Sequence, residues 1–184
     1  MMIDELSSDE QLIQEIQTGN VEAMSLLYRR HRPAIFRYVQ ARIYDWHQAQ
    51  DITGEIFLRM VNYLPQYQIT GAPFIAWLFR IAHNIIITHG QQESRIPLVP
   101  LSHADNHAHP QDNPAQLVEN KLQMEWVWQG LQQLDENQRD VIILRFLVGL
   151  ALKDVAHALD KNIGTIKTLQ HRGILALRVA LQTV

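Results

Sequence analysis

The chain has 184 residues, enough for one large domain or two small ones. Apolar residues make up 47% of the sequence, so each of two parts can bury a hydrophobic core. Cysteine is absent, which excludes disulfide bonds and thiolate metal sites and fits a reducing cytoplasm. The formal net charge of −3 argues against an indiscriminate nucleic-acid binder.

The sequence contains no targeting or membrane signal. Its start, MMIDELSSDEQ, has neither the basic patch nor the apolar run of a secretory signal. The longest apolar runs, such as residues 85–87, are far shorter than the roughly 20 residues that a membrane span needs. We therefore expect a cytoplasmic protein without membrane insertion.

Apolar residues recur at spacings of three and four, which predicts helices throughout. Ser8 with Gln11 resembles a capping box, and Gly19 is expected to end that first helix. Asn20 is expected to cap a second helix, which runs as far as Pro33. A third helix follows Pro33.

Two more helices are predicted in the first half of the chain. One extends from about Gln48 and stops before Pro65. In the other, Pro73 suits the first turn and Gly90 suits the C-terminal stop. This last helix is apolar on most sides, so we expect its neighbours to enclose it. Its few polar positions are Arg80, His83, Asn84 and His89.

Residues 93–114 break the helical pattern. Four of the seven prolines lie there, which indicates an extended, flexible linker. Beyond it, apolar spacing predicts a helix up to Leu134, and Asp135 with Gln138 is expected to cap another that runs to Gly149. The predicted fold is all-α, with a helical domain at 1–92, a linker at 93–114 and a second helical domain at 115–184.

The stretch LDKNIGTIKTLQHR, residues 159–172, has the pattern of a helix-turn-helix. Small or apolar side chains occupy the inward positions of two short helices that cross steeply. These positions are Val155, Ala156, Leu159, Ile166 and Leu169. Asn162 is expected to cap the second helix at Thr165. Asp160 stands where glycine is common, because the turn favours a positive φ.

The second helix would expose Lys167, Thr168, His171 and Arg172, side chains that can contact phosphates and base edges in a major groove. The local excess of positive charge supports this interpretation, since residues 145–184 hold six Lys or Arg against two Asp. A plain helical hairpin is the alternative. A second basic stretch, Arg29 to Arg42, is equally consistent with a solvated helix face.

Both halves resemble one family. LQQLDENQRDVIILRFLVGLALKDVAHALDKNIGTIKTLQHRGILALR resembles the C-terminal domain of bacterial RNA polymerase sigma factors of the extracytoplasmic-function (ECF) group. DITGEIFLRMVNYLPQYQITGAPFIAWLFRIAHNIIITH resembles their N-terminal domain. The resemblance implies a protein that binds core RNA polymerase and directs promoter-specific initiation. It also implies promoter DNA and an anti-sigma factor as partners, with no cofactor and no enzymatic activity.

The resemblance assigns roles to particular residues. Asp51, Glu55 and Arg59 match the polar face that the family uses to grip polymerase; two ordinary surface ion pairs are the alternative. Phe74, Trp77, Arg80, His83 and Asn84 match the helix that melts and recognises the −10 element, although Phe74 and Trp77 fit a core role better. Asn162, Thr165, Lys167, Thr168, His171 and Arg172 match the −35 reading helix.

The sequence departs from the family pattern in ways that weaken DNA contacts. Gly54 replaces a glutamine in the docking helix, at a cost of about 1 kcal/mol relative to a good helix former. Ala151 replaces a serine that can cap the first helix of the motif. Leu169 and Gln170 invert the usual arginine-then-leucine order, which removes a phosphate contact.

Three other interpretations are open at this point. The departures fit a sigma-like protein that binds polymerase but has weakened promoter recognition. A free helix-turn-helix regulator would normally dimerise, yet no heptad seam is present. An enzyme fits poorly, because the carboxylates Asp51 and Glu55 lack a partner base. His103, His107 and His109 could hold a metal, but histidines in a flexible tract more often do nothing, and we predict no metal site.

Overall fold

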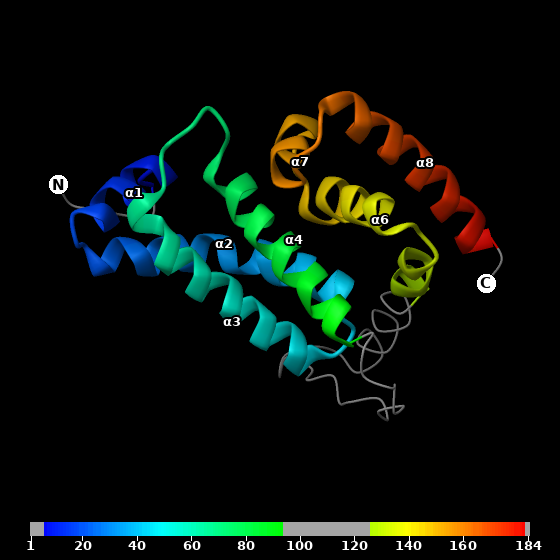
Figure 1. Cartoon of the computed structure of the whole chain (residues 1–184), viewed down its shortest axis with the longest axis horizontal. Coiled ribbons are helices and arrows are strands. Elements are labelled where there is room, and N and C mark those ends of the chain that lie inside the picture. The colour runs from blue at the N-terminus through cyan, green and yellow to red at the C-terminus, as the bar shows by residue number, and fades with distance from the viewer. Residues whose placement is uncertain (1–5, 94–125, 183–184) are drawn as a thin grey trace.

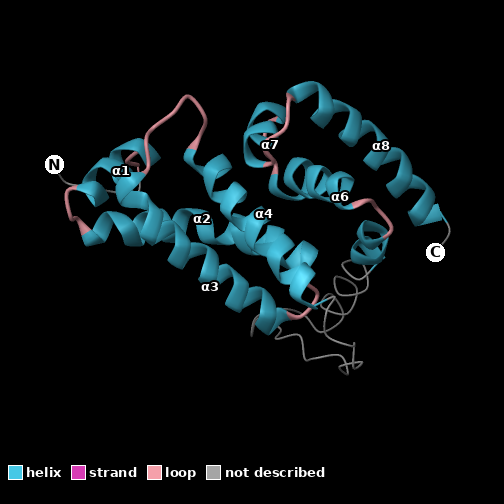
Figure 2. Cartoon of the chain, viewed as in Figure 1, coloured by secondary structure: helices cyan, strands magenta, loops and turns pink. Residues whose placement is uncertain are grey.

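The computed structural model describes residues 6–93 and 126–182. Within these residues every regular element is a helix, as Figure 2 shows, which confirms the predicted all-α class. The proline-rich stretch and its three histidines, His103, His107 and His109, lie outside the described residues.

The N-terminal half contains four α-helices and one short 3-10 helix. They are α1 (Asp9–Gln17), α2 (Val21–Arg42), α3 (Trp46–Tyr63), η1 (Leu64–Gln66) and α4 (Phe74–Glu93). Helices α2, α3 and α4 pack against one another, and α1 packs on α2 (Figure 1). This bundle carries all the residues assigned to polymerase docking and the −10 element.

Helix α2 runs without interruption through Pro33, so the expected break between a second and a third helix is wrong. Proline lacks an N–H and frees the carbonyl four residues earlier. Pro33 and Arg29 are both exposed, so water can satisfy that carbonyl. Burial of His31, Ile35 and other side chains on the inner face holds the helix together on either side.

Other helix ends follow the sequence closely. Ser8 and Gln11 form the predicted capping box, with Ser8 N donating to Gln11 Oε1 at 2.8 Å. Gly19 has a φ of 97°, which glycine adopts at little cost, and Asn20 caps α2 by accepting from Glu22 N at 3.0 Å. Gly90 does not end α4, which continues to Glu93, so that expected stop is wrong.

The C-terminal half is also helical. Helical turns at 126–132 precede α6 (Glu136–Ile142), the π-helix η2 (Ile143–Val148), α7 (Leu152–Ala158) and α8 (Ile163–Gln182). Asp135 caps α6, accepting from Asn137 N at 3.0 Å. Gly149, with a φ of 90°, ends η2 as the sequence predicts.

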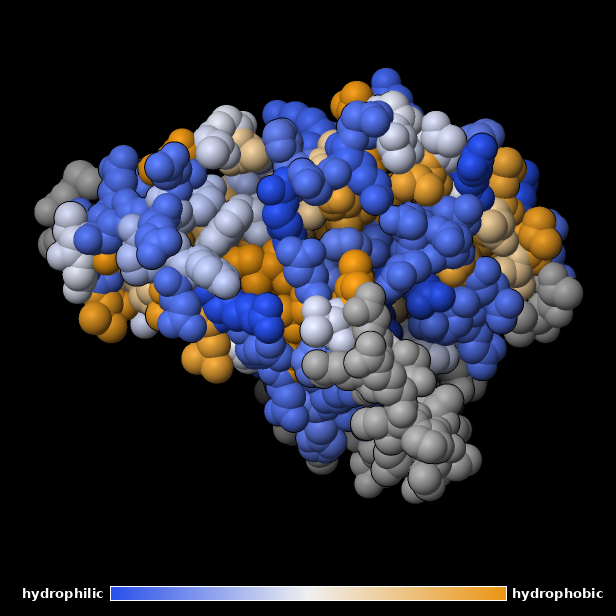
Figure 3. Space-filling view, in the orientation of Figure 1, coloured by the Kyte–Doolittle hydropathy of each residue, from blue (hydrophilic) through white to orange (hydrophobic). Residues whose placement is uncertain are grey.

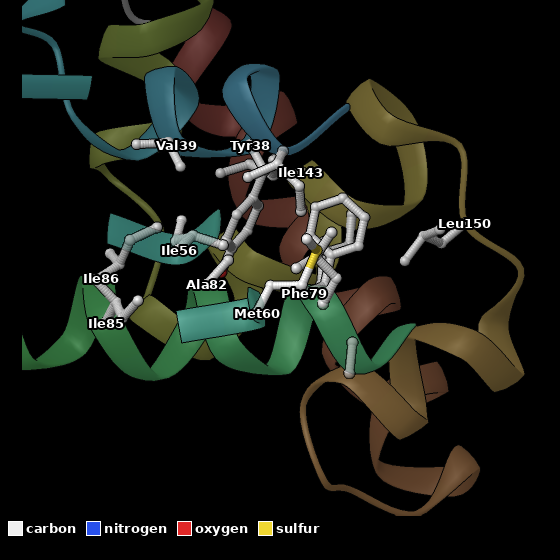
Figure 4. Packing of buried hydrophobic residues seen from close by; sticks show 14 of the residues in the cluster. Tyr38, Val39, Ile56, Met60, Phe79, Ala82, Ile85, Ile86, Ile143 and Leu150 are labelled. Carbon is white, nitrogen blue, oxygen red and sulfur yellow. The ribbon is translucent and has the colours of Figure 1, made fainter. Parts of the chain in front are cut away.

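The two halves pack side by side, with α4 next to α7 (Figure 1). Their buried side chains form one continuous hydrophobic cluster. Figure 4 shows Tyr38 from α2 and Phe79 from α4 close to Ile143 from η2. The residues on either side of the expected linker therefore contribute to one shared hydrophobic core.

Much of the surface is hydrophilic. On the face that Figure 3 shows, hydrophilic residues predominate and hydrophobic ones gather in smaller groups. In the described residues, no helix is long and apolar enough to cross a membrane.

Candidate nucleic-acid interface

The turn between α7 and α8 has the geometry of a helix-turn-helix. Asp160 adopts a φ of 52°, the left-handed conformation that the sequence pattern requires. Asn162 Oδ1 then accepts from Thr165 N at 2.8 Å and from Thr165 Oγ1 at 3.1 Å, which caps α8. Both local predictions are confirmed. The cap fixes the direction in which α8 leaves the turn.

The inward positions of the motif pack as expected. Val155, Leu159 and Ile166 are buried, and Leu169 is partly buried against the same core. Ala156 is also partly buried against this core. This packing holds the outer face of α8 in a fixed orientation.

The outer face of α8 exposes the side chains assigned to −35 recognition. Asn162, Thr165, Lys167, Thr168, His171 and Arg172 are all exposed. Within residues 6–93 and 126–182, neither Lys167 nor Arg172 forms an ion pair. Their charges are therefore available to phosphates or guanine edges.

Gln170 has a structural partner that sequence reasoning missed. Its Oε1 accepts from Arg145 Nε at 3.2 Å, and Arg145 also donates to the carbonyl of Leu150. Arg145 therefore ties η2 to α8 and to the loop before α7. The two residues are 25 positions apart, so no helical periodicity links them.

A second polar face lies on α3, where the residues assigned to polymerase docking are found. Glu55 Oε1 accepts from Arg59 Nη2 at 2.8 Å, and Glu55 Oε2 lies 3.0 Å from His89 Nε2. The hydrogen bond with His89, reinforced by Arg59, lowers the pKa of Glu55 despite partial burial. Asp51 is exposed one turn earlier on the same face. His89 is the one member of this group that the sequence did not assign.

Phe74 and Trp77, at the start of α4, belong to an aromatic cluster. Phe74 is 2% exposed and lies against His31 and Tyr67. Trp77 is partly buried and contacts Phe74 and Tyr67, with ring centroids 5.3 and 4.7 Å away. In this arrangement Phe74 is core, whereas Trp77 remains partly exposed.

Arg80 contacts the C-terminal half. Its Nη2 donates to the carbonyl oxygen of His157 at 2.6 Å and to Asp160 Oδ1 at 3.1 Å, and its Nε donates to the same carbonyl at 3.1 Å. His157 is in α7, and Asp160 forms the turn before α8. A residue assigned to the −10 element therefore binds the helix-turn-helix directly.

His83 lies beside a buried carboxylate from the other half. Its Nδ1 lies 3.1 Å from Asp140 Oδ2, close enough for an ion pair when His83 is protonated. The contact does not have the geometry of a hydrogen bond, so Oδ2 has no hydrogen-bond donor among the described residues. Asp140 Oδ1 accepts from Tyr38 Oη and from Arg42 Nη1, both at 2.9 Å. We call Tyr38, Arg42, His83 and Asp140 the Asp140 cluster. Asn84, the next residue of α4, is exposed.

Burial and charge shift two pKa values in this cluster. Burial raises the pKa of Tyr38 well above its usual value, and the neighbouring Asp140 charge raises it further. Burial, the largest single effect, lowers the pKa of Arg42, but its interactions with Asp140, Tyr38 and Glu136 together outweigh burial and the net shift is upward. Tyr38 therefore remains a neutral donor and Arg42 a cation, which matches the two bonds that Asp140 accepts.

The described residues contain no group of three or more histidine, cysteine or acidic side chains arranged to hold a metal ion. An open groove of about 400 Å³ lies between α2 and α3, lined by Met24, Tyr28, Phe57, Val61 and neighbours. It is lined mainly by apolar side chains and contains no acid–base pair, so it does not suggest a catalytic centre.

Comparison with known families identifies both halves. Residues 27–96 match the model of sigma-70 region 2, and residues 130–179 match that of sigma-70 region 4. The chain belongs to the sigma-70 family, in its ECF group. The helix-turn-helix of α7 and α8 lies within the region 4 match, and α3 and α4 lie within the region 2 match.

Curated sigma factors share this likeness over nearly the whole chain. The ECF RNA polymerase sigma factor BldN of Streptomyces coelicolor is 30% identical over 91% of the chain. The chain spans 63% of BldN's own length. The RNA polymerase sigma-H factor of Pseudomonas aeruginosa is 27% identical, and the match covers 95% of this chain and 94% of that factor.

A solved structure shares the fold. CnrH, determined in complex with the cytosolic domain of CnrY, superposes with a TM-score of 0.75 at 21% identity. The match covers 96% of this chain and 99% of CnrH. Because it spans both halves, the packing of one half on the other belongs to the shared fold.

Proposed function

We propose that this chain is an ECF sigma factor that binds core RNA polymerase and directs initiation at promoters with −35 and −10 elements. One observation carries the proposal: a rigidly packed helix, α8, presents an exposed basic and polar face in a chain whose other half matches sigma-70 region 2. We assign no bond chemistry to the chain, because polymerase supplies it.

The C-terminal half, 115–184, would read the −35 element. Asn162 and Thr165 set the start of α8, and this end of the helix enters the major groove in motifs of this kind. Lys167 and Arg172 supply charge for phosphates or guanine, whereas Thr168 and His171 supply hydrogen-bonding groups.

The N-terminal half, 1–92, would dock on polymerase and engage the −10 element, with 93–114 as the linker. Asp51, Glu55 and Arg59 form the docking face, and His89 orients Glu55. Arg80, His83 and Asn84, with the partly exposed Trp77, would contact the unwound strand, where stacking and cation contacts are the usual means of binding. Phe74 would support this helix from the core.

The proposed partners and location follow from the family. We assign the protein to the cytoplasm, where polymerase and the chromosome lie. The CnrH structure contains the cytosolic domain of CnrY, and another structural relative, RpoE of Bartonella quintana, is solved with the anti-sigma factor NepR. An anti-sigma protein is accordingly the expected regulator of this chain.

A second candidate function is polymerase binding with weakened promoter recognition. Two observations favour it: Ala151 gives α7 no side-chain cap, and Leu169, which stands where the family has arginine, packs against the hydrophobic core. Transcription in vitro with core polymerase on a genomic library separates the two candidates. Discrete start sites support a working sigma factor, polymerase binding without starts supports the weakened version, and absence of polymerase binding contradicts both.

A further inference from the structure

His89 reaches the docking face from a different helix. Glu55 and Arg59 lie on α3, whereas His89 belongs to the C-terminal part of α4, which packs beside α3 (Figure 1). His89 Nε2 lies 3.0 Å from Glu55 Oε2, and Arg59 Nη2 lies 2.8 Å from Glu55 Oε1. Each oxygen of the carboxylate therefore has its own partner. The two contacts restrict the rotation of Glu55, the middle residue of the docking face.

The three side chains remain accessible to a partner protein. Glu55, Arg59 and His89 have side-chain exposures of 37%, 44% and 32%. A carboxylate oxygen can accept a second hydrogen bond, so a partner can bind Glu55 while His89 and Arg59 hold it. Because the group is this exposed, water screens its charges and the pairs contribute little to the stability of the fold. Substitution of His89 should therefore change the docking face without unfolding the chain.

The protonation state of His89 sets the net charge of this surface. Asp51, Glu55 and Arg59 together have one net negative charge. A neutral imidazole donates its Nε2–H to Glu55 and leaves that charge unchanged, whereas a protonated imidazole cancels it. Histidine is the side chain that ordinarily changes charge between pH 5 and 8. Glu55 stays ionised over this range, because the hydrogen bond with His89 and the contacts with Arg59 lower its pKa.

Other charged groups near α4 belong to separate contacts. On α4 itself, Arg80 and His83 precede His89 by nine and six residues. Among the described side chains, the polar partners that α2, α6 and the turn after α7 offer to α4 all meet Arg80 or His83. They are Tyr38, Asp140 and Asp160. The exposed His47 on α3 lies two turns before Glu55 on the same face. A pH effect of His89 must therefore be separated from one of His47, which substitution of His89 alone achieves.

The chemistry of the docking face indicates a cationic partner surface. Two acids, Asp51 and Glu55, face solvent together, and interfaces place charges of opposite sign against each other. Protonated His89 would lie beside the same cations and repel them. Neutral His89 instead holds Glu55 in place through a hydrogen bond and leaves its charge available.

We propose that His89 positions Glu55 against a cationic surface of core polymerase, and that protonation of His89 weakens this docking as the pH falls from 8 to 6. This inference rests on the proposed function, which assigns the docking face to polymerase. Two effects are combined in one side chain: its hydrogen bond fixes the geometry of Glu55, and its charge controls the net charge of the face.

Two substitutions separate these effects in the full-length chain. His89→Gln places an amide N–H near the position of the imidazole Nε2, so it keeps a donor for Glu55 but has no charge to gain. His89→Ala removes both the donor and the charge. His157→Gln removes an exposed histidine from the other half of the chain and is the control for loss of a histidine. Circular dichroism melts verify that each variant is folded.

Binding to core polymerase is measured by fluorescence anisotropy at pH 8 and pH 6, at one low ionic strength. The sequence has no cysteine, so Gln182→Cys gives every variant a single label at an exposed position in α8. Changes in polymerase itself between the two pH values are common to all variants and cancel in the comparison.

We expect the unaltered chain to lose about threefold more affinity between pH 8 and pH 6 than His89→Gln loses, the size of effect typical of one exposed charge pair. At pH 8 His89→Gln should bind within about twofold of the unaltered chain, and His89→Ala about threefold more weakly. His157→Gln should follow the unaltered chain at both pH values.

Equal pH dependence in His89→Gln and the unaltered chain overturns the proposal. Unweakened binding of folded His89→Ala at pH 8 also overturns it, because Glu55 would then need no positioning. If His89→Ala does not fold, the comparison with His89→Gln decides alone. Failure of the proposed function has a different signature, since the unaltered chain would then bind polymerase at neither pH.

Discussion

The carboxylate of Asp140 lies 2.9 Å from the guanidinium of Arg42, although 98 residues separate them in the chain. Asp140 belongs to the region 4 match and Arg42 to the region 2 match. Both side chains are almost fully buried, with exposures of 1% and 6%. This buried pair helps to fix the orientation of the two halves, because either charge would be strongly unfavourable if it were buried without the other.

Replacement of Asp140 by alanine should lower the free energy of unfolding by about 3 kcal/mol, because it leaves the Arg42 charge buried beside Tyr38. Glu136→Ala is the matched control, since it removes the exposed partner of the same arginine and should cost less than about 1 kcal/mol. Urea denaturation measures both. Equal losses in the two variants would show that burial of Asp140 is unimportant for stability.

Acid should weaken the contact between α1 and α2 through Asp9. Asp9 binds Arg30 at 2.7 Å and His31 at 2.9 Å. Burial alone would raise its pKa, but these partners together outweigh burial and hold the pKa of Asp9 below its usual value. A lowered folded-state pKa gives stability that is present above the unfolded pKa and lost as the pH falls through the folded one.

The Asp9→Asn variant should therefore show a weaker dependence of unfolding free energy on pH below about pH 4. Chemical denaturation at a series of acid pH values measures this slope. Glu10→Gln is the control, since it removes an exposed carboxylate from the same turn. A steeper acid loss in Asp9→Asn than in the unaltered chain would contradict the assignment.

Gly54 offers a stabilising substitution in the docking helix. It lies inside α3, is exposed, and an added Cβ would meet no atom within 4 Å. Gly54→Ala should raise the free energy of unfolding by about 0.5–1 kcal/mol, because alanine loses less backbone entropy in a helix.

Gly173→Ala is the contrasting variant. An added Cβ there would lie 2.9 Å from Ile142 Cγ1, so the buried contact between α6 and α8 must shift. We expect a loss of about 1–3 kcal/mol from overpacking. Thermal melts compare the pair, and stabilisation by both substitutions would show that the α6–α8 contact adjusts freely.

Simultaneous replacement of Lys167 and Arg172 by alanine should reduce promoter-specific transcription by roughly 100-fold, because each cation contributes about 1–3 kcal/mol of DNA contact. Co-purification with core polymerase should persist. Lys153→Ala with Arg178→Ala removes two exposed cations outside the assigned set and should have a much smaller effect. Undiminished transcription by the Lys167 and Arg172 double variant would exclude this face of α8 as the reading surface.

Reversal of charge at Glu55 should weaken polymerase binding at least about tenfold, because Glu55→Lys places a cation beside Arg59 and His89 and disrupts the docking face. Glu22→Lys makes the same change at an exposed site on α2. Fluorescence anisotropy with core polymerase measures both affinities. Similar affinities for the two variants would remove α3 from the interface.

Local sequence determined the individual helices and the helix-turn-helix. Ser8, Asn20, Asp135 and Asn162 each accept a nearby backbone N–H, and such contacts depend on residues only two or three positions away. The positive φ at Asp160 is local in the same sense. Where the local rule failed at Pro33, burial of the inner face of α2 outweighed the preference of one residue. At Gly90 the preference also failed, since α4 continues to Glu93.

Only the tertiary structure decided how the halves meet. The Asp140 cluster, the contact of Arg80 with the turn before α8, and the bond between His89 and Glu55 join residues 34 to 102 positions apart. Periodicity reports which face of a helix is buried, but it does not report which distant surface covers that face. The buried charge of Asp140 restricts which surfaces can meet. Its carboxylate is stable in the interior only where Tyr38 and Arg42 donate hydrogen bonds to it.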